Sequence, residues 1–408
     1  MKRRDVMKFA GASVFFTPIM YNCSLEKTAL NSRHLVETPE KRIVYLSQML
    51  KVLCTDLGPH PMGSPEFNKA VQIVEKEMKQ ALPIVELDTF TVDYWVMRGE
   101  PELYVGDQRL EAYPRIETAG TPPNGVSGIL NRMDNKGIPY GVVDRSSGEI
   151  RGYITPYGGK ARPLYASGEE LKRIPTFTVG NQDVPLLEKA IENETTIHVR
   201  LPIDVIPNTP TSNVVGILPG ESKDEIVFLA HLDTVYASPG ANDNTASLVV
   251  MLMLAHAVSG THPKKKLTFI ATTGEERGGF RGATHYVEKR KKEGTLKNIK
   301  FVVNFDSGTW SPDIEIWSED EELQDLIQAI DRDLNVNGTP QRVNKTGFSL
   351  DARPFQESGA RAIYVESNGP DKIHIWHRPL DTPENVPGYT VEICFQLFHE
   401  FIKRVQDM

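Results

Sequence analysis

The chain has few cysteines and no excess of basic residues, and both absences exclude classes of protein. Three cysteines in 408 residues are too few for the disulfide framework of a small secreted domain. A formal net charge of -8 leaves no basic surface of the kind that binds nucleic acid. The acidic balance favours solubility and says little about a substrate.

The sequence motifs of covalent hydrolases are also missing. The chain has no Gly-x-Ser-x-Gly sequence, the motif that exposes a serine nucleophile, and none of its cysteines stands in a catalytic context. Hydrolysis through a protein nucleophile is therefore disfavoured. The proportions of hydrophobic and charged residues, 39% and 25%, are those of an ordinary soluble enzyme.

The apolar stretch near the amino terminus, residues 9–20, is too short to span a bilayer. It has the length of a signal-peptide core, and Arg3 and Arg4 before it resemble a twin-arginine export signal. We expect residues 1–22 to be an export signal that directs the protein to the periplasm or the cell envelope. Cys23 would follow at a lipoprotein position, but the residues before it are a poor match to that motif, so membrane attachment through a lipidated Cys23 and an unmodified Cys23 both stay open.

Acidic and imidazole side chains recur where short apolar runs end. The runs at 225–230, 267–273 and 301–305 are rich in β-branched and aromatic residues, which predicts buried strands. In an open α/β sheet, ligands bind at the carboxyl edge of the strands. The side chains that follow the runs, or lie in loops between them, are His231, Asp233, Asp243, Glu275, Glu276, Asp306 and His377.

Two imidazoles and several carboxylates at such an edge suit a metal site better than an ion-pair network. Neutral His and ionised Asp or Glu are ligand types that zinc takes. Each motif alone has an ordinary explanation, such as a solvated turn for Glu275 and Glu276 or a strand end for Asp306. Together, in this order and each after a strand, they predict a metal hydrolase.

The order and residue content of these motifs resemble those of the co-catalytic di-zinc exopeptidases. This family includes bacterial leucyl aminopeptidases, aminopeptidase S, glutamate carboxypeptidase and glutaminyl cyclase. The resemblance covers most of the chain from about Leu46 onward. It implies an α/β fold with a mixed central sheet flanked by helices, and two zinc ions. By motif, His231 and Asp306 would hold one ion, Glu276 and His377 would hold the other, and Asp243 would bridge the two.

The resemblance also assigns catalytic roles. Asp233 would be the carboxylate that orients the His231 ring, as a metal-bound imidazole usually requires. Glu275 would be the general base that takes a proton from a metal-activated water and passes it to the leaving amine. Trp376 stands where aminopeptidase relatives often carry Tyr. It would either line the pocket wall, which we favour, or bind the oxyanion of the substrate through its indole N–H.

The pattern of the chain predicts a divided catalytic domain. Residues 23–98 form its first part and residues 206–408 its core, while residues 99–205 read as a β-rich insert with short strands, glycines and prolines. The end of this insert resembles a protease-associated domain, and the alternative is a β-rich excursion packed on the catalytic sheet. Because the insert supplies none of the expected ligands, we expect it to serve substrate access or packing.

Three function classes follow. The first is an exported zinc aminopeptidase that removes N-terminal residues from peptides. The second is carboxypeptidase cleavage or cyclisation of N-terminal glutamine on the same scaffold. The third is a metal-free binding protein, as in the transferrin receptor, and the intact ligand set argues against it. The sequence identifies neither the group that grips a substrate terminus nor the oligomeric state.

Overall fold

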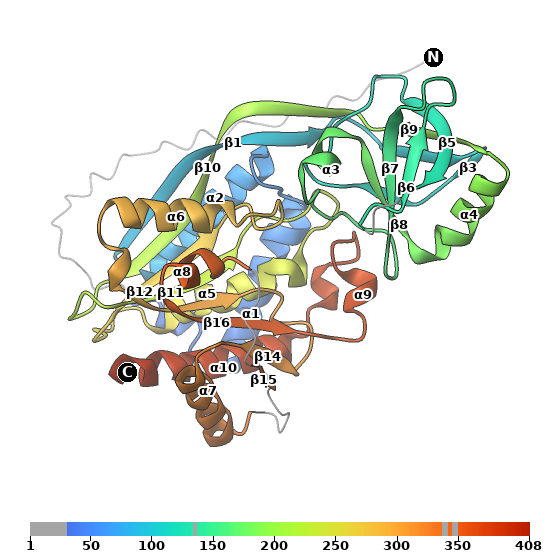
Figure 1. The fold of residues 1–408 in the computed structure, drawn as a ribbon. Helices are drawn as coiled ribbons and strands as arrows, with labels where there is room; N and C mark the ends of the chain where they lie inside the picture. Colours follow the sequence, from blue (N-terminus) through green and yellow to red (C-terminus); the bar gives the residue numbers. More distant parts are fainter. Residues whose placement is uncertain (1–30, 134–136, 337–341, 345–349) are drawn as a thin grey trace, which may run out of the picture.

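The computed structural model describes residues 31–133, 137–336, 342–344 and 350–408. They form two eight-stranded sheets, seen at opposite ends of the molecule in Figure 1. The strands of the first sheet are, in spatial order, β1 (Ile84–Met97), β10 (Ile203–Leu218), β12 (Lys266–Thr272), β11 (Glu225–His231), β13 (Ile299–Phe305), β16 (Arg361–Ser367), β14 (Ile314–Trp317) and β15 (Arg342–Asn344).

The centre of the first sheet is parallel and its flanks are partly antiparallel. Strands β12, β11, β13 and β16 run parallel, whereas β10 is antiparallel to β12 and β14 is antiparallel to β16. Every residue of β11 is buried, as expected for a parallel strand covered on both faces. The predicted α/β fold with a mixed central sheet is therefore confirmed.

Helices cover both faces of this sheet. On one face, Phe228 and Phe269 pack in a core with α5 (Ala246–Ala257), which is itself covered by α1 (Pro39–Leu50), α2 (Pro65–Ala81) and α10 (Gly388–Arg404). On the other face, Val227 and Ile270 pack with α6 (Arg281–Lys292) and α8 (Arg353–Glu357). Adjacent residues of one strand thus point into different cores, because side chains alternate along a strand. Helix α7 (Glu321–Leu334) packs beside α10.

The second sheet lies within residues 102–200, inside the predicted insert, and has its own hydrophobic core. Helix α4 (Val184–Glu192) packs on it through Leu187 and Ala190, and α3 (Glu169–Arg173) lies beside the sheet. Its strands are, in spatial order, β3 (Gln108–Arg109), β2 (Glu102–Val105), β9 (Thr196–Arg200), β5 (Val126–Arg132), β6 (Tyr140–Val143), β7 (Ile150–Tyr157), β8 (Thr176–Gly180) and β4 (Ala112–Pro114).

A long antiparallel ribbon joins the two sheets. Strands β1 and β10 pair from Ile84 opposite Ile217 to Met97 opposite Ile203, so both chain connections of the second sheet leave from one end of this ribbon. Figure 1 shows the ribbon reaching from the first sheet to the second. The insert is therefore attached to the catalytic sheet by paired strands and not by single linkers.

The two described cysteines are not linked, and the predicted export signal lies outside the described residues. Cys54 and Cys394 are buried and free, so they do not pair. Residues 1–22 and Cys23, on which export and lipidation were predicted, lie outside the described residues. Within the described part, no helix has the length and apolar character needed to cross a membrane.

Candidate active site

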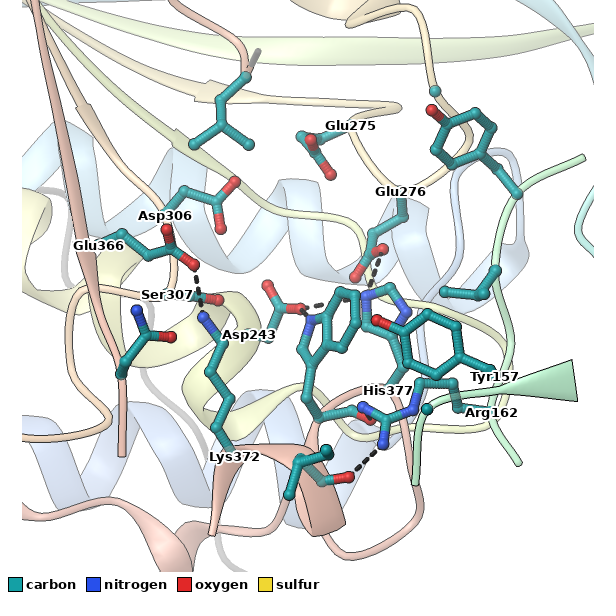
Figure 2. A pocket seen from close by; sticks show the side chains of 18 of the residues that line it. Tyr157, Arg162, Asp243, Glu275, Glu276, Asp306, Ser307, Glu366, Lys372 and His377 are labelled. Carbon is teal, nitrogen blue, oxygen red and sulfur yellow. Dashed lines mark hydrogen bonds and ion pairs between the residues drawn. The ribbon is translucent and has the colours of Figure 1, made fainter. Parts of the chain in front are cut away.

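The five predicted metal ligands come together at the carboxyl edge of the first sheet, and Figure 2 labels Asp243, Glu276, Asp306 and His377 among them. They come from different elements: the end of β11, the helical turn η4 (Ala241–Thr245), the loop after β12, the residue after β13 and the loop after α9 (Lys372–Ile375). All are less than one tenth exposed: His231 1%, Asp243 5%, Glu276 6%, Asp306 6% and His377 8%. Ionisable side chains buried to this degree need partners of opposite charge or a metal.

The five side chains form two adjoining groups that share one aspartate. In the first group, His231 Nε2 lies 3.3 Å from Asp243 Oδ1 and 3.7 Å from Asp306 Oδ1. In the second, His377 Nε2 lies 3.2 Å from Asp243 Oδ2 and 3.0 Å from Glu276 Oε2. Each group offers one ligand atom per residue within 4.8 Å of the others. Asp243 thus presents one oxygen to each group.

The hydrogen bonds of the two imidazoles leave their Nε2 atoms for a ligand. His231 Nδ1 lies 2.9 Å from the carbonyl oxygen of Asp233, and His377 Nδ1 lies 2.9 Å from that of Pro163. A carbonyl can only accept, so each Nδ1 donates, and each Nε2 has a free lone pair when the ring is neutral, the form that binds a metal. Within the described structure, His231 Nε2 and Glu276 Oε1 are buried without a hydrogen-bond partner. This donor set fits zinc, which takes imidazole nitrogen and carboxylate oxygen.

Electrostatics also favour a bound cation. Burial, together with the charge of Asp306, raises the pKa of Glu275 well above its ordinary value, and burial raises the pKa of Glu276 to about 7. Burial alone would lower the pKa of His231, but the negative charges of Asp306 and Asp243 raise it well above the ordinary range. The carboxylates thus repel one another in a buried space, and a divalent cation would stabilise all of them in the ionised form.

Asp233 occupies the predicted place but acts differently. Its carboxylate accepts the backbone N–H groups of Gly274 at 2.7 Å and of Glu275 and Glu276 at 3.3 Å. The His231 ring is held by the backbone carbonyl of Asp233, so the prediction that the carboxylate orients this ring is wrong. The reason is that three buried N–H groups of the loop after β12 need an acceptor. Asp233 therefore fixes the loop that carries the paired glutamates.

Trp376 lies in the pocket wall, as in the interpretation that we favoured. Its ring packs against His377 with 3.9 Å between centroids, and its Nε1 donates a hydrogen bond to Asp243 Oδ2. The indole N–H is therefore engaged by a predicted ligand and is not free for an oxyanion.

Asp381 is a contributor that the sequence reasoning did not assign. Its carboxylate accepts the backbone N–H groups of Asn242 at 2.8 Å and of Asp243 at 3.0 Å, and it also accepts the Asn242 side-chain amide at 3.2 Å. It thereby sets the backbone that presents Asp243 to both groups. The His-x-x-x-Asp spacing from His377 to Asp381 was the available signal.

The insert does more than the predicted access or packing, because two of its described residues contact the loop that carries His377. Pro163 orients His377, and the neighbouring Arg162 is only 1% exposed. The Arg162 guanidinium donates to the carbonyl oxygens of Trp376 at 3.2 Å, Lys160 at 3.3 Å and Ile373. It also lies over the Trp376 ring at 5.3 Å. Arg162 thus ties the insert to the loop that carries His377.

We predict that Arg162→Met weakens one metal position selectively. Loss of these charged hydrogen bonds, about 1.5 to 3 kcal/mol for a single one, should lower the affinity for the ion at Glu276 and His377 by at least about tenfold. The ion at His231 and Asp306 should be little affected. Calorimetric zinc titration of the metal-depleted protein measures both steps.

The control for this prediction is Arg98→Met, because Arg98 lies at the insert end of β1 with its side chain 52% exposed and, in the described structure, pairs with Asp204. Arg162→Lys keeps the charge but not the planar fork, so an intermediate affinity is expected. Equal weakening of both zinc steps in Arg162→Met would contradict the assignment.

A cavity of about 940 Å³ opens over the two groups. Tyr157, Tyr165 and Phe280 contribute apolar wall. At the end beside Asp306, Glu366 Oε1 and Lys372 Nζ form an ion pair of 2.5 Å (Figure 2). The cavity is large enough for a short peptide segment, since ligand pockets commonly measure ~300 to 1,000 Å³.

A mixed α/β sheet whose carboxyl edge carries two histidine–carboxylate groups around a shared aspartate defines a metal-dependent hydrolase. The comparisons with known proteins make this class more specific. Residues 213–402 match the sequence model of Peptidase family M28. This part of the chain is similar to that family, and the match together with the relatives below supports a metallopeptidase.

Two curated relatives and one solved structure illustrate the similarity. Carboxypeptidase Q of Mus musculus is 24% identical over 316 residues, which cover 65% of this chain and 65% of the relative. Aminopeptidase YwaD of Bacillus subtilis (strain 168) is 24% identical over 368 residues, covering 81% of this chain and 77% of the relative. A zinc aminopeptidase structure from Bacillus subtilis superposes with a TM-score of 0.69 at 19% identity, covering 89% of this chain and 95% of that one. At that identity the superposition establishes the fold alone.

Proposed function

We propose that the protein is a zinc-dependent aminopeptidase that removes N-terminal residues from peptides. The observation that favours an aminopeptidase over a carboxypeptidase is that the cationic side chains described in the pocket are already engaged by other groups. Among the described lining residues outside the ligand set, Lys372 is paired with Glu366 and Arg162 donates to backbone carbonyls. Among the described lining residues, the cavity therefore offers no unengaged cation for a C-terminal carboxylate, which favours cleavage from the amino end of a peptide.

The site residues have two proposed roles, metal binding and proton transfer. His231 and Asp306 would hold one zinc ion, Glu276 and His377 would hold a second, and Asp243 would serve both groups. Bound zinc supplies Lewis-acid chemistry, which polarises a carbonyl and lowers the pKa of water. Glu275 lines the cavity and belongs to neither ligand group. It takes the proton of the attacking water and delivers it to the leaving amine.

Matched peptides test the proposal on the purified protein with zinc. We expect release of the N-terminal residue from peptides with a free amino terminus, including C-terminally amidated ones, and no release from their N-acetylated forms. Release of the C-terminal residue from acetylated peptides would replace the proposal with carboxypeptidase activity, the second candidate, which the similarity to carboxypeptidase Q favours. Pyroglutamate formation from glutaminyl peptides without any release of amino acids would assign cyclisation.

We also propose export to the periplasm or cell envelope. The support is the sequence of residues 1–22 alone, with the arginine pair before a short apolar stretch. Cell fractionation of the full chain, compared with an Arg3→Lys/Arg4→Lys variant, should show export that the variant loses. Cytoplasmic retention of both proteins would refute the proposal.

A further inference from the structure

A second hollow adjoins the catalytic cavity and has a different charge. It measures about 400 Å³ and shares Tyr165, Gly278 and Gly279 with the catalytic cavity. Three basic side chains belong to its lining: Lys172 from the insert, and Arg277 and Arg281 from the catalytic domain. The hollow therefore lies where the insert meets the loop of the paired glutamates.

The three cations converge on one carboxylate. Glu117 Oε1 accepts hydrogen bonds from Arg277 Nε at 3.0 Å, Arg277 Nη2 at 2.6 Å and Arg281 Nη2 at 2.6 Å. Lys172 Nζ lies 3.3 Å from Glu117 Oε2. Three positive charges against one negative charge leave an excess of two positive charges. This excess stands out in a chain whose formal net charge is -8.

The cluster also has an unused hydrogen-bond donor in the described structure. In the described structure, Arg281 Nε is buried without a hydrogen-bond partner. The side chains of Lys172 and Arg281 are each 37% exposed, while that of Arg277 is 7% exposed. Lys172 and Arg281 are accessible to a ligand, so a second carboxylate beside Glu117 would add compensating charge and stabilise the cluster. Guanidinium groups suit that ligand, because their planar fork matches a carboxylate.

The chain places this cluster beside the reacting centre. Arg277 directly follows the proposed ligand Glu276, and Gly278 and Gly279 continue the wall that the two hollows share. Gly278 has a φ of +71°, and a Cβ there would lie 2.9 Å from the Tyr165 ring, so no larger residue fits without displacing that ring. Because the two hollows share this wall, a peptide with its scissile bond near Glu276 can extend along it into the basic hollow.

We propose that the basic hollow, defined by Lys172, Arg277 and Arg281, is a subsite that binds a carboxylate of the substrate on the leaving-group side of the scissile bond. The inference rests on the proposed peptidase function and deepens it by naming the substrate class. The carboxylate has two sources of the same chemistry: the C-terminus of a short peptide or the side chain of an acidic residue. Either source supplies the second negative charge.

Two pairs of matched substrates separate the sources. The first pair is a tripeptide with a free C-terminus and its C-terminal amide. The second pair is an amidated dipeptide with glutamate after the scissile bond and the same dipeptide with glutamine. We expect the carboxylate member of at least one pair to have a kcat/KM about tenfold higher, through a lower KM, since hydrogen bonds to charged groups contribute about 1.5 to 3 kcal/mol.

The variants Lys172→Met and Arg281→Met should abolish that preference while amide substrates change less than about twofold. Each leaves Glu117 with two of its three cationic partners. Lys289→Met is the matched control, because Lys289 lies on α6 like Arg281, is 33% exposed and pairs instead with Glu86 and Asp88. Absence of any preference in the wild type, or a preference that survives in both variants, would overturn the proposal.

A binding experiment keeps the subsite separate from the proposed function. Calorimetry of the zinc-loaded Glu275→Gln protein with the same peptides measures affinity without turnover. Tighter binding of the carboxylate member, lost in Lys172→Met, supports the subsite even if the wild type releases no N-terminal residue. Equal affinity of both members refutes the subsite even if aminopeptidase activity is established.

Discussion

Replacing Glu275 with glutamine should lower kcat by about 10² to 10⁴-fold, the range typical for loss of a general acid–base group, while metal content stays unchanged. Glutamine keeps the size of the side chain but has no carboxylate to accept a proton. Glu275 lines the cavity and lies near Asp306, whose charge, after burial, contributes to its raised pKa. It is absent from both groups of ligand atoms, which is why the metal positions should survive.

The neighbouring glutamate supplies the comparison. Glu276→Gln should weaken the metal position shared with His377, because Glu276 Oε2 lies 3.0 Å from His377 Nε2. Single-turnover rates and metal analysis of both variants distinguish the two roles. Near-normal turnover in Glu275→Gln would remove Glu275 from the mechanism, and metal loss in that variant would make it a ligand.

Replacing Asp243 with asparagine should reduce both metal positions together and bring activity close to background. One oxygen of Asp243 faces His231 and the other faces His377, at 3.3 and 3.2 Å. Asparagine removes the negative charge and turns one of these oxygens into a donor. His231→Ala and His377→Ala should each lower the occupancy of one position first.

Metal analysis after dialysis measures how many ions the wild type and the Asp243, His231 and His377 variants each retain. The wild type should retain about two ions per chain, as expected of a two-metal site, and a chelator should abolish its activity. Asp204→Asn is the control, because Asp204 lies on the exposed ribbon and its side chain is 61% exposed. Retention of one full zinc equivalent in Asp243→Asn would show that this carboxylate is not shared.

The central sheet was predictable because burial on both faces leaves an uninterrupted apolar run. The runs at 225–230, 267–273 and 301–305 became β11, β12 and β13 within one or two residues. Their parallel arrangement brings their carboxyl ends to one edge, so the convergence of His231 and Asp306 also followed from the sequence. Asp243 and His377 lie in loops, and their place rested on the resemblance.

The remaining parts of the site could not be predicted, for two physical reasons. The contacts of Arg162 and Pro163 depend on how the insert sits on the catalytic sheet, and no local pattern in the chain encodes that docking. The choice between the carboxylate and the carbonyl of Asp233 as the partner of His231 depends on the turn after β11. Both are decided by tertiary packing.

The ribbon of β1 and β10 suggests that the insert could be deleted by design, because Met97 and Ile203 are paired neighbours and a tight turn could join them. Such a shortened protein would keep its central sheet and all five proposed ligands. It would lose the carbonyl that orients His377, the arginine that holds the Trp376 loop and the lysine and glutamate of the basic hollow. We therefore expect folding and catalysis to have different boundaries in this chain: the protein without its insert should fold but not work, and exchange of the insert between relatives would have to preserve its contacts with the loop that carries His377.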